Sequence, residues 1–367
     1  MKFSIENINL IKLLQNLYTL ANSNLSLSIL NNVLIKVSSN YILFLRTNTE
    51  VEITVKIDNC NIINIGTITV SIKKLYNICK KLSNDNIINI SLENNKLIIR
   101  TKNSLYSLST LPDKGFPKIN YKKSNIYCTL SSKVLLNALS CTYFSMAKQD
   151  IRYYLNGMLF KITSNNMMYI VSTNGHRLSI CRININFNIS NISIIIPRNG
   201  ILELMRLLNK CKCLISMFFN DDSISLSIDN YMFTSKLIDG TFPNFINVIP
   251  KNVDIKISLE LMELKSALSR IITIVNDKSY SIKLIISRSK LTLIANNLDF
   301  EIAKEIIIIP YDGKNIEFAF NAIYILDVLN VLHCKIVTLT FTNDGILKIS
   351  DLISQQLLTY IIMPIKI

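Results

Sequence analysis

Apolar residues recur along the chain with the spacing of a helix face, in three similar stretches. The stretches are residues 70–82, 196–208 and 320–332. In the first stretch the apolar positions i, i+3, i+4 and i+7 are Leu75, Ile78, Cys79 and Leu82. The same offsets hold Ile201, Leu204, Met205 and Leu208, and then Ile325, Val328, Leu329 and Leu332. This spacing places the side chains on one face, so it predicts three equivalent amphipathic helices.

Two further elements repeat at a similar distance. Three short segments each lead from an extended start into another amphipathic helix, at Ile5, Leu10 and Leu14, at Leu130, Leu135 and Leu139, and at Leu259, Leu264 and Leu268. The Phe-Pro pairs at Phe116 and Phe242 lie 126 residues apart. Repeats of this kind indicate one structural unit used several times. We therefore predict three domains, residues 1–124, 125–250 and 251–367.

The segments between the helices alternate or cluster apolar residues around short polar turns, as strands do. The predicted strands are 32–37, 41–45 and 51–57 in the first copy, 157–163, 167–172 and 177–182 in the second, and 281–287, 290–295 and 301–309 in the third. Each copy thus reads as two helices on one face of an antiparallel sheet. This is an α+β fold.

Composition excludes several protein classes. The chain has 367 residues, of which 49% are hydrophobic, so large cores are expected and disorder is excluded. Apolar runs stop within a few residues, far below the ~18–20 that a membrane span needs. Polar residues in the first fourteen positions leave no signal peptide. Eight cysteines without a Cys-x-x-Cys pair favour reduced core cysteines in a cytosolic protein.

The net charge of +15 is by itself a weak indicator. It fits nucleic acid, an anionic surface, or a codon bias that enriches Lys, Ile and Asn. The charge is uneven, because residues 1–124 hold 16 basic and 7 acidic side chains, residues 125–250 hold 11 and 6, and residues 251–367 hold 13 and 12. The net charge therefore falls from the first copy to the last.

Catalytic machinery is absent from the sequence. The two histidines, His176 and His333, belong to no metal-binding pattern, and no Gly-rich phosphate loop or Gly-x-Ser-x-Gly motif occurs. The pair Asp221-Asp222 stands in a polar turn between predicted strands. A hydrolase or nuclease is therefore disfavoured, and we expect a binding or scaffolding protein with no cofactor and no metal.

Several long motifs resemble one family. Residues 149–160 read Gln-Asp-Ile-Arg-Tyr-Tyr-Leu-Asn-Gly-Met-Leu-Phe, residues 172–178 read Ser-Thr-Asn-Gly-His-Arg-Leu, and residues 360–367 read Tyr-Ile-Ile-Met-Pro-Ile-Lys-Ile. Together with the start Met-Lys-Phe, the segment 233–237 and the second Phe-Pro pair, they resemble the bacterial DNA sliding clamps, the beta subunits of DNA polymerase III. The resemblance runs from end to end.

The resemblance implies a non-catalytic, cytoplasmic and nucleoid-associated processivity factor. Two chains would join head to tail into a ring that encircles double-stranded DNA without sequence preference. The partners it implies are a second copy, the catalytic subunit of DNA polymerase III, the clamp loader, repair polymerases, a mismatch-repair protein and ligase, with no membrane.

In such a ring the helices face DNA, so their basic residues are candidate phosphate contacts. The expected DNA-binding residues are Lys12, Lys73, Lys74, Lys80, Lys81, Lys133, Gln149, Arg152, Tyr153, Tyr154, Arg198 and Arg206. Each lysine taken alone also fits a solvated helix face. Asn24 stands where an Arg of the family usually touches DNA.

The resemblance also implies a pocket between the second and third domains for short, mostly apolar peptides. Its expected wall is Leu155, Thr173, Gly175, His176, Arg177, Leu178, Pro243, Val248, Asn321, Tyr324, Ile361, Met363, Pro364, Ile365 and Lys366. The chain departs from the family at Asn247, Leu347 and Lys366, which predicts a more apolar pocket with an altered peptide preference.

The family joins an edge strand of the first domain to one of the third. The expected dimer contacts are Lys74, Arg100, Leu105, Tyr106, Leu108, Thr273, Ile274, Asp299 and Glu301. The alternative is a basic, non-catalytic nucleic-acid-binding scaffold whose ring or partner set has degenerated. The mass of the assembly in solution discriminates between the two.

Overall fold

The computed structural model describes residues 1–20, 28–58, 60–83, 87–119, 127–185, 191–250, 254–275, 280–297, 299–353 and 356–365. The chain forms two compact units. The first comprises Met1–Leu135 and Asn199–Leu237, and the second comprises Leu136–Arg198 and Ile238–Ile367. Among the described residues, no helix combines the length and the apolar character that a membrane crossing requires.

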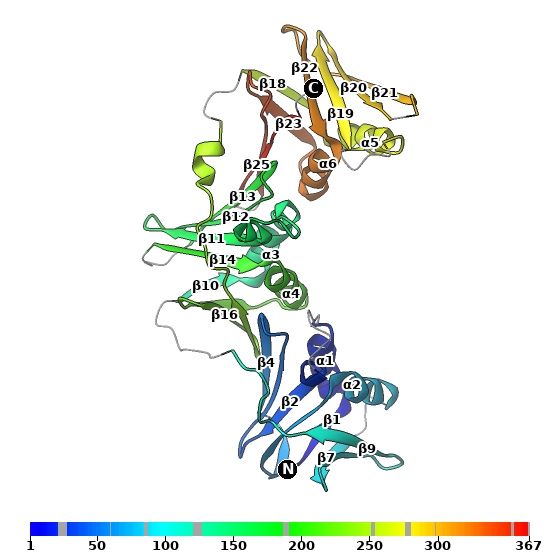
Figure 1. The fold of residues 1–367 in the computed structure, drawn as a ribbon, viewed down its shortest axis with the longest axis vertical. Coiled ribbons are helices and arrows are strands. Elements are labelled where there is room, and N and C mark those ends of the chain that lie inside the picture. The colour runs from blue at the N-terminus through cyan, green and yellow to red at the C-terminus, as the bar shows by residue number, and fades with distance from the viewer. Residues whose placement is uncertain are drawn as a thin grey trace. The chain divides into compact units, whose positions relative to one another are not determined.

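In the described part of the first unit, one antiparallel sheet of 13 strands has the order β10-β15-β16-β17-β4-β3-β2-β6-β9-β8-β7-β1-β5. Its strands are β1 (Lys2–Glu6), β2 (Asn32–Val37), β3 (Ile42–Thr47), β4 (Val51–Ile57), β5 (Asn61–Asn64), β6 (Gly66–Ser71), β7 (Ile87–Glu93), β8 (Lys96–Arg100), β9 (Leu105–Leu111), β10 (Tyr127–Ser131), β15 (Leu214–Phe219), β16 (Ser223–Ile228) and β17 (Tyr231–Lys236). Helices α1 (Asn7–Tyr18) and α2 (Ile72–Lys81) lie side by side against one face (Figure 1).

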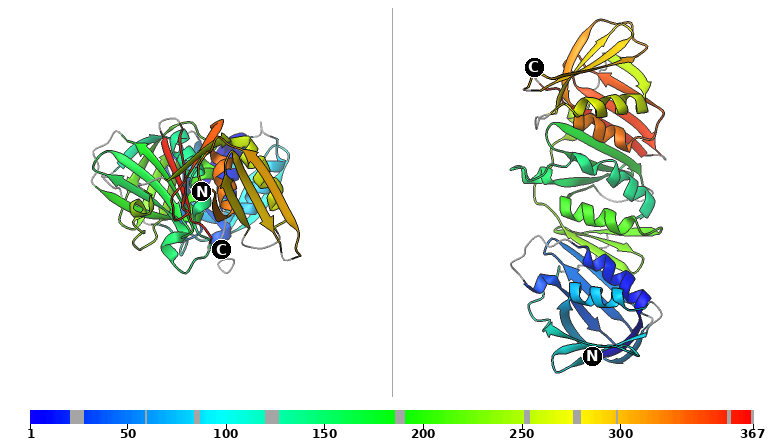
Figure 2. Two further views of the ribbon diagram at one scale, coloured as in Figure 1. Left: turned by 90° about the horizontal axis from the view of Figure 1, so that it is seen from above. Right: turned by 90° about the vertical axis from the view of Figure 1, so that its right-hand side faces the viewer.

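The described part of the second unit contains an 8-stranded sheet, β14-β11-β12-β13-β25-β24-β23-β18, and a 4-stranded sheet, β21-β20-β19-β22. The strands are β11 (Gly157–Thr163), β12 (Met167–Thr173), β13 (Arg177–Asn184), β14 (Ile192–Pro197), β18 (Ile255–Glu260), β19 (Ser281–Ser287), β20 (Lys290–Asn296), β21 (Ile302–Ile308), β22 (Ile316–Asn321), β23 (Ile336–Phe341), β24 (Leu347–Ile353) and β25 (Gln356–Ile362). Helices α5 (Leu261–Ile272) and α6 (Ala322–Val331) pack together beside these sheets (Figure 2).

The amphipathic pattern and the capping residues explain the helices. α6 buries Ile325, Val328 and Leu329, the positions that the repeat marked as apolar. The Asn321 side chain caps it by accepting hydrogen bonds from the backbone N–H groups of Ile323 and Tyr324. Ser71 caps α2 in the same way. Helices α3 (Ser132–Ser140) and α4 (Arg198–Leu208) complete the predicted set, and each continues across the boundary between the units.

The predicted strands are confirmed, with seven ends that differ. β3 begins one residue later than predicted, at Ile42. Four strands, β3, β12, β13 and β20, extend further than predicted, because ladder pairing continues; Thr47 of β3, for example, still pairs with Glu52. β12 extends to Thr173, which pairs with Leu178, and β13 extends to Asn184, which pairs with Met167. β21 is shorter than predicted, Ile302–Ile308, since Glu301 belongs to the preceding turn. The turn that contains Asp221 and Asp222 joins β15 to β16, as expected.

The two compact units do not coincide with the three repeats. Strands β10 and β15–β17 of the second repeat belong to the first unit, and β11–β14 belong to the second. Residues 120–126 and 251–253, which contain the predicted domain boundaries, lie outside the described residues. The eight cysteines are free, and Cys79, Cys128, Cys141 and Cys181 are buried.

Candidate peptide pocket and DNA-facing surface

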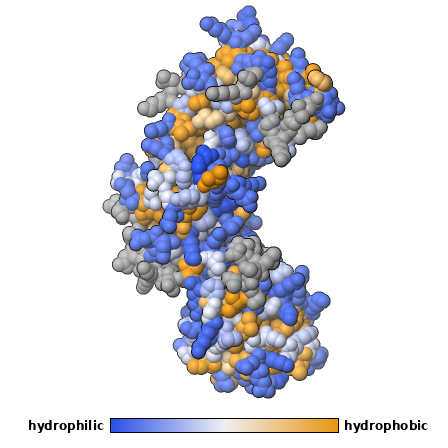
Figure 3. Space-filling view, in the orientation of Figure 1, coloured by the Kyte–Doolittle hydropathy of each residue, from blue (hydrophilic) through white to orange (hydrophobic). Residues whose placement is uncertain are grey.

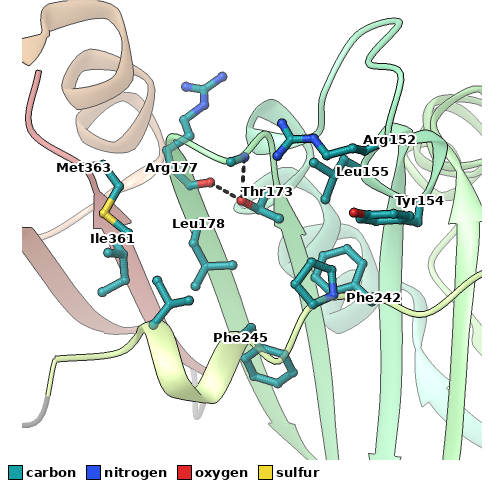
Figure 4. A pocket seen from close by; sticks show the side chains of 13 residues that line it. Arg152, Tyr154, Leu155, Thr173, Arg177, Leu178, Phe242, Phe245, Ile361 and Met363 are labelled. Atoms are coloured by element: carbon teal, nitrogen blue, oxygen red, sulfur yellow. Dashed lines mark hydrogen bonds between the residues drawn. The ribbon is translucent and has the colours of Figure 1, made fainter.

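A pocket of about 220 Å³ opens in the second unit, where strands of the second and third repeats meet (Figure 4). Its lining is Arg152, Tyr154, Leu155, Thr173, Gly175, Arg177, Leu178, Phe242, Pro243, Phe245, Val248, Ile361 and Met363. Most of these side chains are apolar, and a few polar groups stand at the rim. This composition suits a short peptide with apolar side chains.

Two antiparallel strands supply the floor. β13 of the second repeat pairs with β25 of the third, and Leu178 lies directly opposite Ile361. The ladder continues beyond β25, because the Met363 N–H donates to the His176 carbonyl over 2.9 Å. Leu178 and Ile361 are both buried and join an apolar cluster with Leu159 and Val171. The floor of the pocket is therefore formed by the outermost side chains of a packed apolar core.

The turn between β12 and β13 is fixed by its own side chains. Thr173 Oγ1 donates to the Arg177 carbonyl and accepts from the Gly175 N–H, at 2.6 and 3.1 Å. Asn174 Oδ1 accepts from the N–H groups of His176 and Arg177, at 3.0 and 3.1 Å. Gly175 has φ +90°, a conformation that favours glycine. These bonds hold the rim without help from a ligand.

Arg177 turns its guanidinium away from the cavity (Figure 4). Its Nη1 is 2.6 Å from Asp327 Oδ2 on α6, and its Nη2 donates to the Phe144 carbonyl. The guanidinium also lies 4.4 Å from the Tyr324 ring centre and 5.3 Å from that of Phe144. Cation–π contacts of this kind add to the ion pair. Arg177 therefore fastens the pocket rim to the helix of the next repeat.

Arg152 stands at the opposite rim. Its Nε and Nη2 donate to the two carboxylate oxygens of Asp150, at 3.1 and 3.0 Å. These hydrogen bonds lower the pKa of Asp150 to about 2, so the pair stays ionised. A Cβ added to Gly175 would come within 3.0 Å of an Arg152 Nη atom. The glycine thus leaves room for the guanidinium beside the turn.

The segment after β17 forms the remaining wall. A short 3₁₀ helix, η4 (Phe245–Val248), begins after Asn244, whose side chain accepts from the Ile246 N–H. Phe245 and Val248 are three residues apart, so both face the same side. Phe245 is buried against the cluster below Leu178, and Phe242 packs beside it. This segment covers the core and shapes the cavity at the same time.

The structure brings together nine of the residues expected in the pocket: Leu155, Thr173, Gly175, Arg177, Leu178, Pro243, Val248, Ile361 and Met363. Five others do not line it. His176 is exposed, Tyr324 and Asn321 belong to the start of α6, Pro364 packs near Gly345, and Ile365 lines a second cavity. Lys366 lies outside the described residues.

Four pocket residues were not expected there. Arg152 and Tyr154 were expected at DNA, yet both line the cavity. Phe242 and Phe245 were assigned no role, although the Phe-Pro repeat drew attention to their segment. The usable signal was the run of apolar residues that follows this pair, since such a run in a connection must cover something.

Most of the basic residues expected at DNA are exposed. Lys12 lies on α1 and Lys133 on α3, and four lysines, Lys73, Lys74, Lys80 and Lys81, lie on α2. Gln149 and Tyr153 are exposed before β11, and Tyr153 begins the short 3₁₀ helix η3 (Tyr153–Asn156). Asn24 lies outside the described residues. The two arginines Arg198 and Arg206 are half-buried, and Arg198 Nη1 is 3.4 Å from the Met146 carbonyl.

Arg206 is held inside the first unit. Its Nε donates to Glu203 over 2.7 Å, and its Nη2 donates to the Asn16 carbonyl near the end of α1 over 2.7 Å. Lys210 donates to Asn16 Oδ1, also over 2.7 Å. Cations at the carboxyl end of a helix offset its partial negative charge. Arg206 therefore joins α4 to α1 rather than presenting a free charge.

The residues expected at the dimer contact lie in two regions, one in each unit. Leu105 is 65% exposed on β9, and Tyr106 and Leu108 of the same strand are half-buried. Lys74 is exposed on α2, and Arg100 pairs with Glu93 over 2.7 Å. In the second unit, Thr273 and Ile274 follow α5. Asp299 and Glu301 form the turn before β21, and both donate their backbone N–H to Asn297 Oδ1.

The pocket turn has a counterpart in the first repeat. Thr47 Oγ1 donates to the Val51 carbonyl and accepts from the Thr49 N–H, as Thr173 does in its own turn. Asn48 Oδ1 accepts from the next N–H groups, like Asn174. Glu52 pairs with Thr234, and this pair is the equivalent, in the first unit, of the pair formed by Leu178 and Ile361. Glu52 is buried and accepts from the Ile119 N–H over 2.9 Å. A polar core thus replaces the apolar floor at this junction.

Comparison with known proteins gives one consistent match. Family models of the DNA polymerase III beta subunit match its N-terminal domain at residues 1–120, its central domain at 129–244 and its C-terminal domain at 246–366. The beta sliding clamps of Escherichia coli K12 and Salmonella typhimurium are 35% and 34% identical to this chain, over 100% of each chain.

Solved structures agree. The DNA polymerase III subunit beta of Pseudomonas aeruginosa has a TM-score of 0.95 and 32% identity over 100% of both chains. The pol III beta of Caulobacter crescentus has a TM-score of 0.94 and 26% identity, also over 100% of both chains. A further P. aeruginosa sliding clamp, with a TM-score of 0.92 and 32% identity over 100% of both chains, was solved bound to griselimycin.

Proposed function

The chain belongs to the DNA polymerase III beta-subunit family, the DNA sliding clamps, and on this premise we propose that two copies join head to tail into a ring around duplex DNA. As a member of the family it is a non-catalytic replication factor that acts as a sliding clamp. Topology is the proposed source of its processivity, because a closed ring cannot leave DNA sideways. Its place of action is the cytoplasm, at the nucleoid.

The single observation that carries the ring is a repeated strand pairing. In the first unit the last strand of the second repeat, β17, pairs with β4 of the first repeat. In the second unit the last strand of the third repeat, β25, pairs with β13 of the second repeat. The equivalent strands still to be joined are β9, the last strand of the first repeat, and β21 of the third.

Both of these strands present an edge. Among the described residues β21 pairs only with β20, and residues 105–109 of β9 pair only with β8. Unpaired edges invite pairing with another chain. A contact between β9 of one copy and β21 of the next repeats a junction that the chain uses twice, and it closes after two copies.

The same equivalence gives the register. Glu52 faces Thr234, and Leu178 faces Ile361. Ile302, the first residue of β21, is the residue of the third repeat that is equivalent to Glu52 and Leu178. Each of the three pairs with the last residue of the preceding strand, which is Asn296 for Ile302, Thr47 for Glu52 and Thr173 for Leu178. By the same reasoning Ser107 takes the place of Thr234. We therefore expect Ile302 to face Ser107 of the partner subunit, with Leu105 and Leu108 beside the contact.

DNA would meet the helices. Lys73, Lys74, Lys80 and Lys81 project from α2, and Lys12 and Lys133 from α1 and α3. Lysines attract phosphate without reading sequence, which sliding requires. The half-buried Arg198 and Arg206 would contribute less, because their donors already serve carbonyl and carboxylate groups.

The pocket of the second unit would take peptide motifs from the replicative polymerase, the clamp loader, repair polymerases, mismatch-repair protein and ligase. Support comes from its apolar floor, its preformed rim and the griselimycin-bound clamp of P. aeruginosa. Because Arg152 and Tyr154 line this pocket, they would act there rather than on DNA alone.

The oligomeric state tests the ring. Light scattering of the wild type should give about twice the chain mass of 41.8 kDa. Replacing Ile302 by Arg should halve the mass, because a charge would enter the strand junction. The matched control is Lys290→Glu, since Lys290 is exposed on the same sheet but away from the edge. A monomeric wild type at micromolar concentration would exclude the closed ring.

A further inference from the structure

The three repeats each turn one sheet face away from their helices, and these faces correspond residue by residue. In the first repeat Leu34 pairs with Leu45, and in the second Leu159 pairs with Val171. In the third repeat Lys283 pairs with Ile294 in the same register. Paired residues lie on the same face of a sheet. The outer face of the third repeat is the set formed by β19, β20, β21 and β22.

In the first two repeats the chain covers this face with its own connecting segment. Phe116 packs on Leu34 and Leu45, which are 1% and 6% exposed. Phe245 packs on Leu159 and Val171, which are 3% and 0% exposed. Both segments carry a glycine, Gly115 or Gly240, that is followed within two residues by a Phe-Pro pair. The fold thus contains two internal examples of what fits this surface.

The outer face of the third repeat lacks such a cover among the described residues. Ile306 and Ile308 of β21 are 51% and 69% exposed. A cavity of about 330 Å³ lies over the centre of the face and is lined by Ser281, Ile282, Lys283, Ile294, Asn296, Ala319 and Ile365. Hydrophobic and hydrophilic surfaces alternate at the top of Figure 3, where Figure 1 places these strands.

The start of an equivalent connecting segment is nevertheless present in the third repeat. In the second repeat the connecting segment begins with the Ile238 N–H donating to the Ile195 carbonyl over 2.9 Å. In the third, the Ile365 N–H donates to the Ala319 carbonyl over 2.8 Å, at the equivalent position of the sheet. The chain therefore reaches the edge of the cavity in the same way in both repeats.

Cations lie on all three outer faces, with Lys36 and Lys56 on the first and Lys161 and Arg182 on the second. Lys283 replaces the leucines Leu34 and Leu159, and Lys290 and Lys304 are exposed on neighbouring strands of the same face. The facing carboxylate is Glu317, which pairs with Lys283. Cations among apolar side chains favour an occupant that carries both acidic and apolar groups.

We propose that the outer face of the third repeat binds an extended, acidic segment of a partner protein that places an aromatic side chain over Ile294. The segment follows the path that residues 112–119 and 239–248 take over the first two faces. This site is distinct from the peptide pocket, because none of its lining residues lines that pocket. It continues into the proposed subunit junction through β21.

The test uses the full-length dimer and a synthetic peptide of residues 237–249, which carries Asp239, Phe242 and Phe245. The peptide pocket is first blocked by Val248→Asp at a half-buried residue of its wall, so that binding there cannot be mistaken for the new site. Fluorescence anisotropy should then still show saturable binding. Adding Ile294→Glu should weaken it at least tenfold, and a peptide with both phenylalanines replaced by alanine should bind equally weakly.

Two controls keep the outcome decisive. Lys283→Glu replaces Ile294→Glu if the latter fails to fold by circular dichroism, since Lys283 lines the same cavity and its side chain is 40% exposed. Thr67→Glu is the matched surface change in the first unit, and it should leave peptide binding unchanged. No saturable binding to the folded Val248→Asp protein, or equal affinity after Ile294→Glu, would overturn the proposal.

Discussion

The Arg177 guanidinium and the Asp327 carboxylate form an ion pair of 2.6 Å that links the pocket rim on β13 to helix α6. The two side chains are 10% and 31% exposed, and their residues are 150 positions apart in the chain. Arg177 also stacks on Tyr324, whose hydroxyl accepts from Asn174. The rim of the pocket is therefore braced by the third repeat rather than by its own strand alone.

Replacing Asp327 by Asn should destabilise this junction. The guanidinium would keep its burial but lose its counter-charge, which costs about 1–3 kcal/mol of unfolding free energy. We expect a lower thermal midpoint and weaker binding of a clamp-binding peptide, although Asp327 does not line the pocket.

The control for this variant is Asp312→Asn. Asp312 pairs with Arg288, but both side chains are more than 70% exposed, and exposed pairs contribute little. If both variants lose the same stability, the brace has no special role.

Gly175 should not tolerate a side chain. Alanine at φ +90° is strained, and its Cβ would meet the Arg152 guanidinium at 3.0 Å. We expect Gly175→Ala to displace Arg152 and lower peptide affinity in a calorimetric titration. Gly115→Ala is matched in strain, with φ +84° and no neighbour within 4 Å, so it should leave affinity unchanged. Equal losses in the two variants would contradict the steric argument.

Glu52 should make stability depend on pH. Burial raises its pKa above the ordinary value, so the native state binds the proton more tightly than the unfolded state. The free energy of unfolding should therefore fall as pH rises from the ordinary pKa of a glutamate to the raised native value. Glu52→Gln should flatten this fall and raise stability at pH 7.

Urea unfolding at pH 4 to 8 measures the effect. Asp113→Asn removes an exposed carboxylate of the connecting segment and should leave the curve unchanged. A Glu52→Gln protein that keeps the wild-type slope would show that the carboxyl is ionised throughout.

Lys80 and Arg206 should separate DNA binding from stability. Lys80 is exposed on α2, so Lys80→Ala should weaken DNA binding and reduce its salt dependence without changing the thermal midpoint. Arg206→Met should lower the thermal midpoint and leave DNA binding unchanged, because Arg206 donates hydrogen bonds to Glu203 and to the end of α1. Anisotropy with a labelled duplex and thermal unfolding of both variants give the comparison. Equal losses of DNA affinity in the two variants would show that Arg206 contacts DNA.

Much of this architecture could be predicted from local pattern. The apolar spacing at Ile325, Val328 and Leu329 found a helix whose buried face is the predicted one. The family resemblance carried by residues 172–178, rather than local pattern, pointed to the turn that borders the cavity. What local pattern could not give is the partner of a long polar side chain. Arg177 meets Asp327, and Arg206 meets Asn16, across 150 and 190 residues, so their orientation depends on the assembled fold.

Retention on circular DNA tests the ring most directly. Once the clamp loader has placed the protein on nicked circular duplex, gel filtration at high salt should keep it with the DNA, and cutting the circle should release it. High salt removes phosphate contacts but cannot open a topological link. Loss from the intact circle under salt alone, at the same rate as from linear DNA, would contradict the ring and leave a basic scaffold that binds DNA by charge.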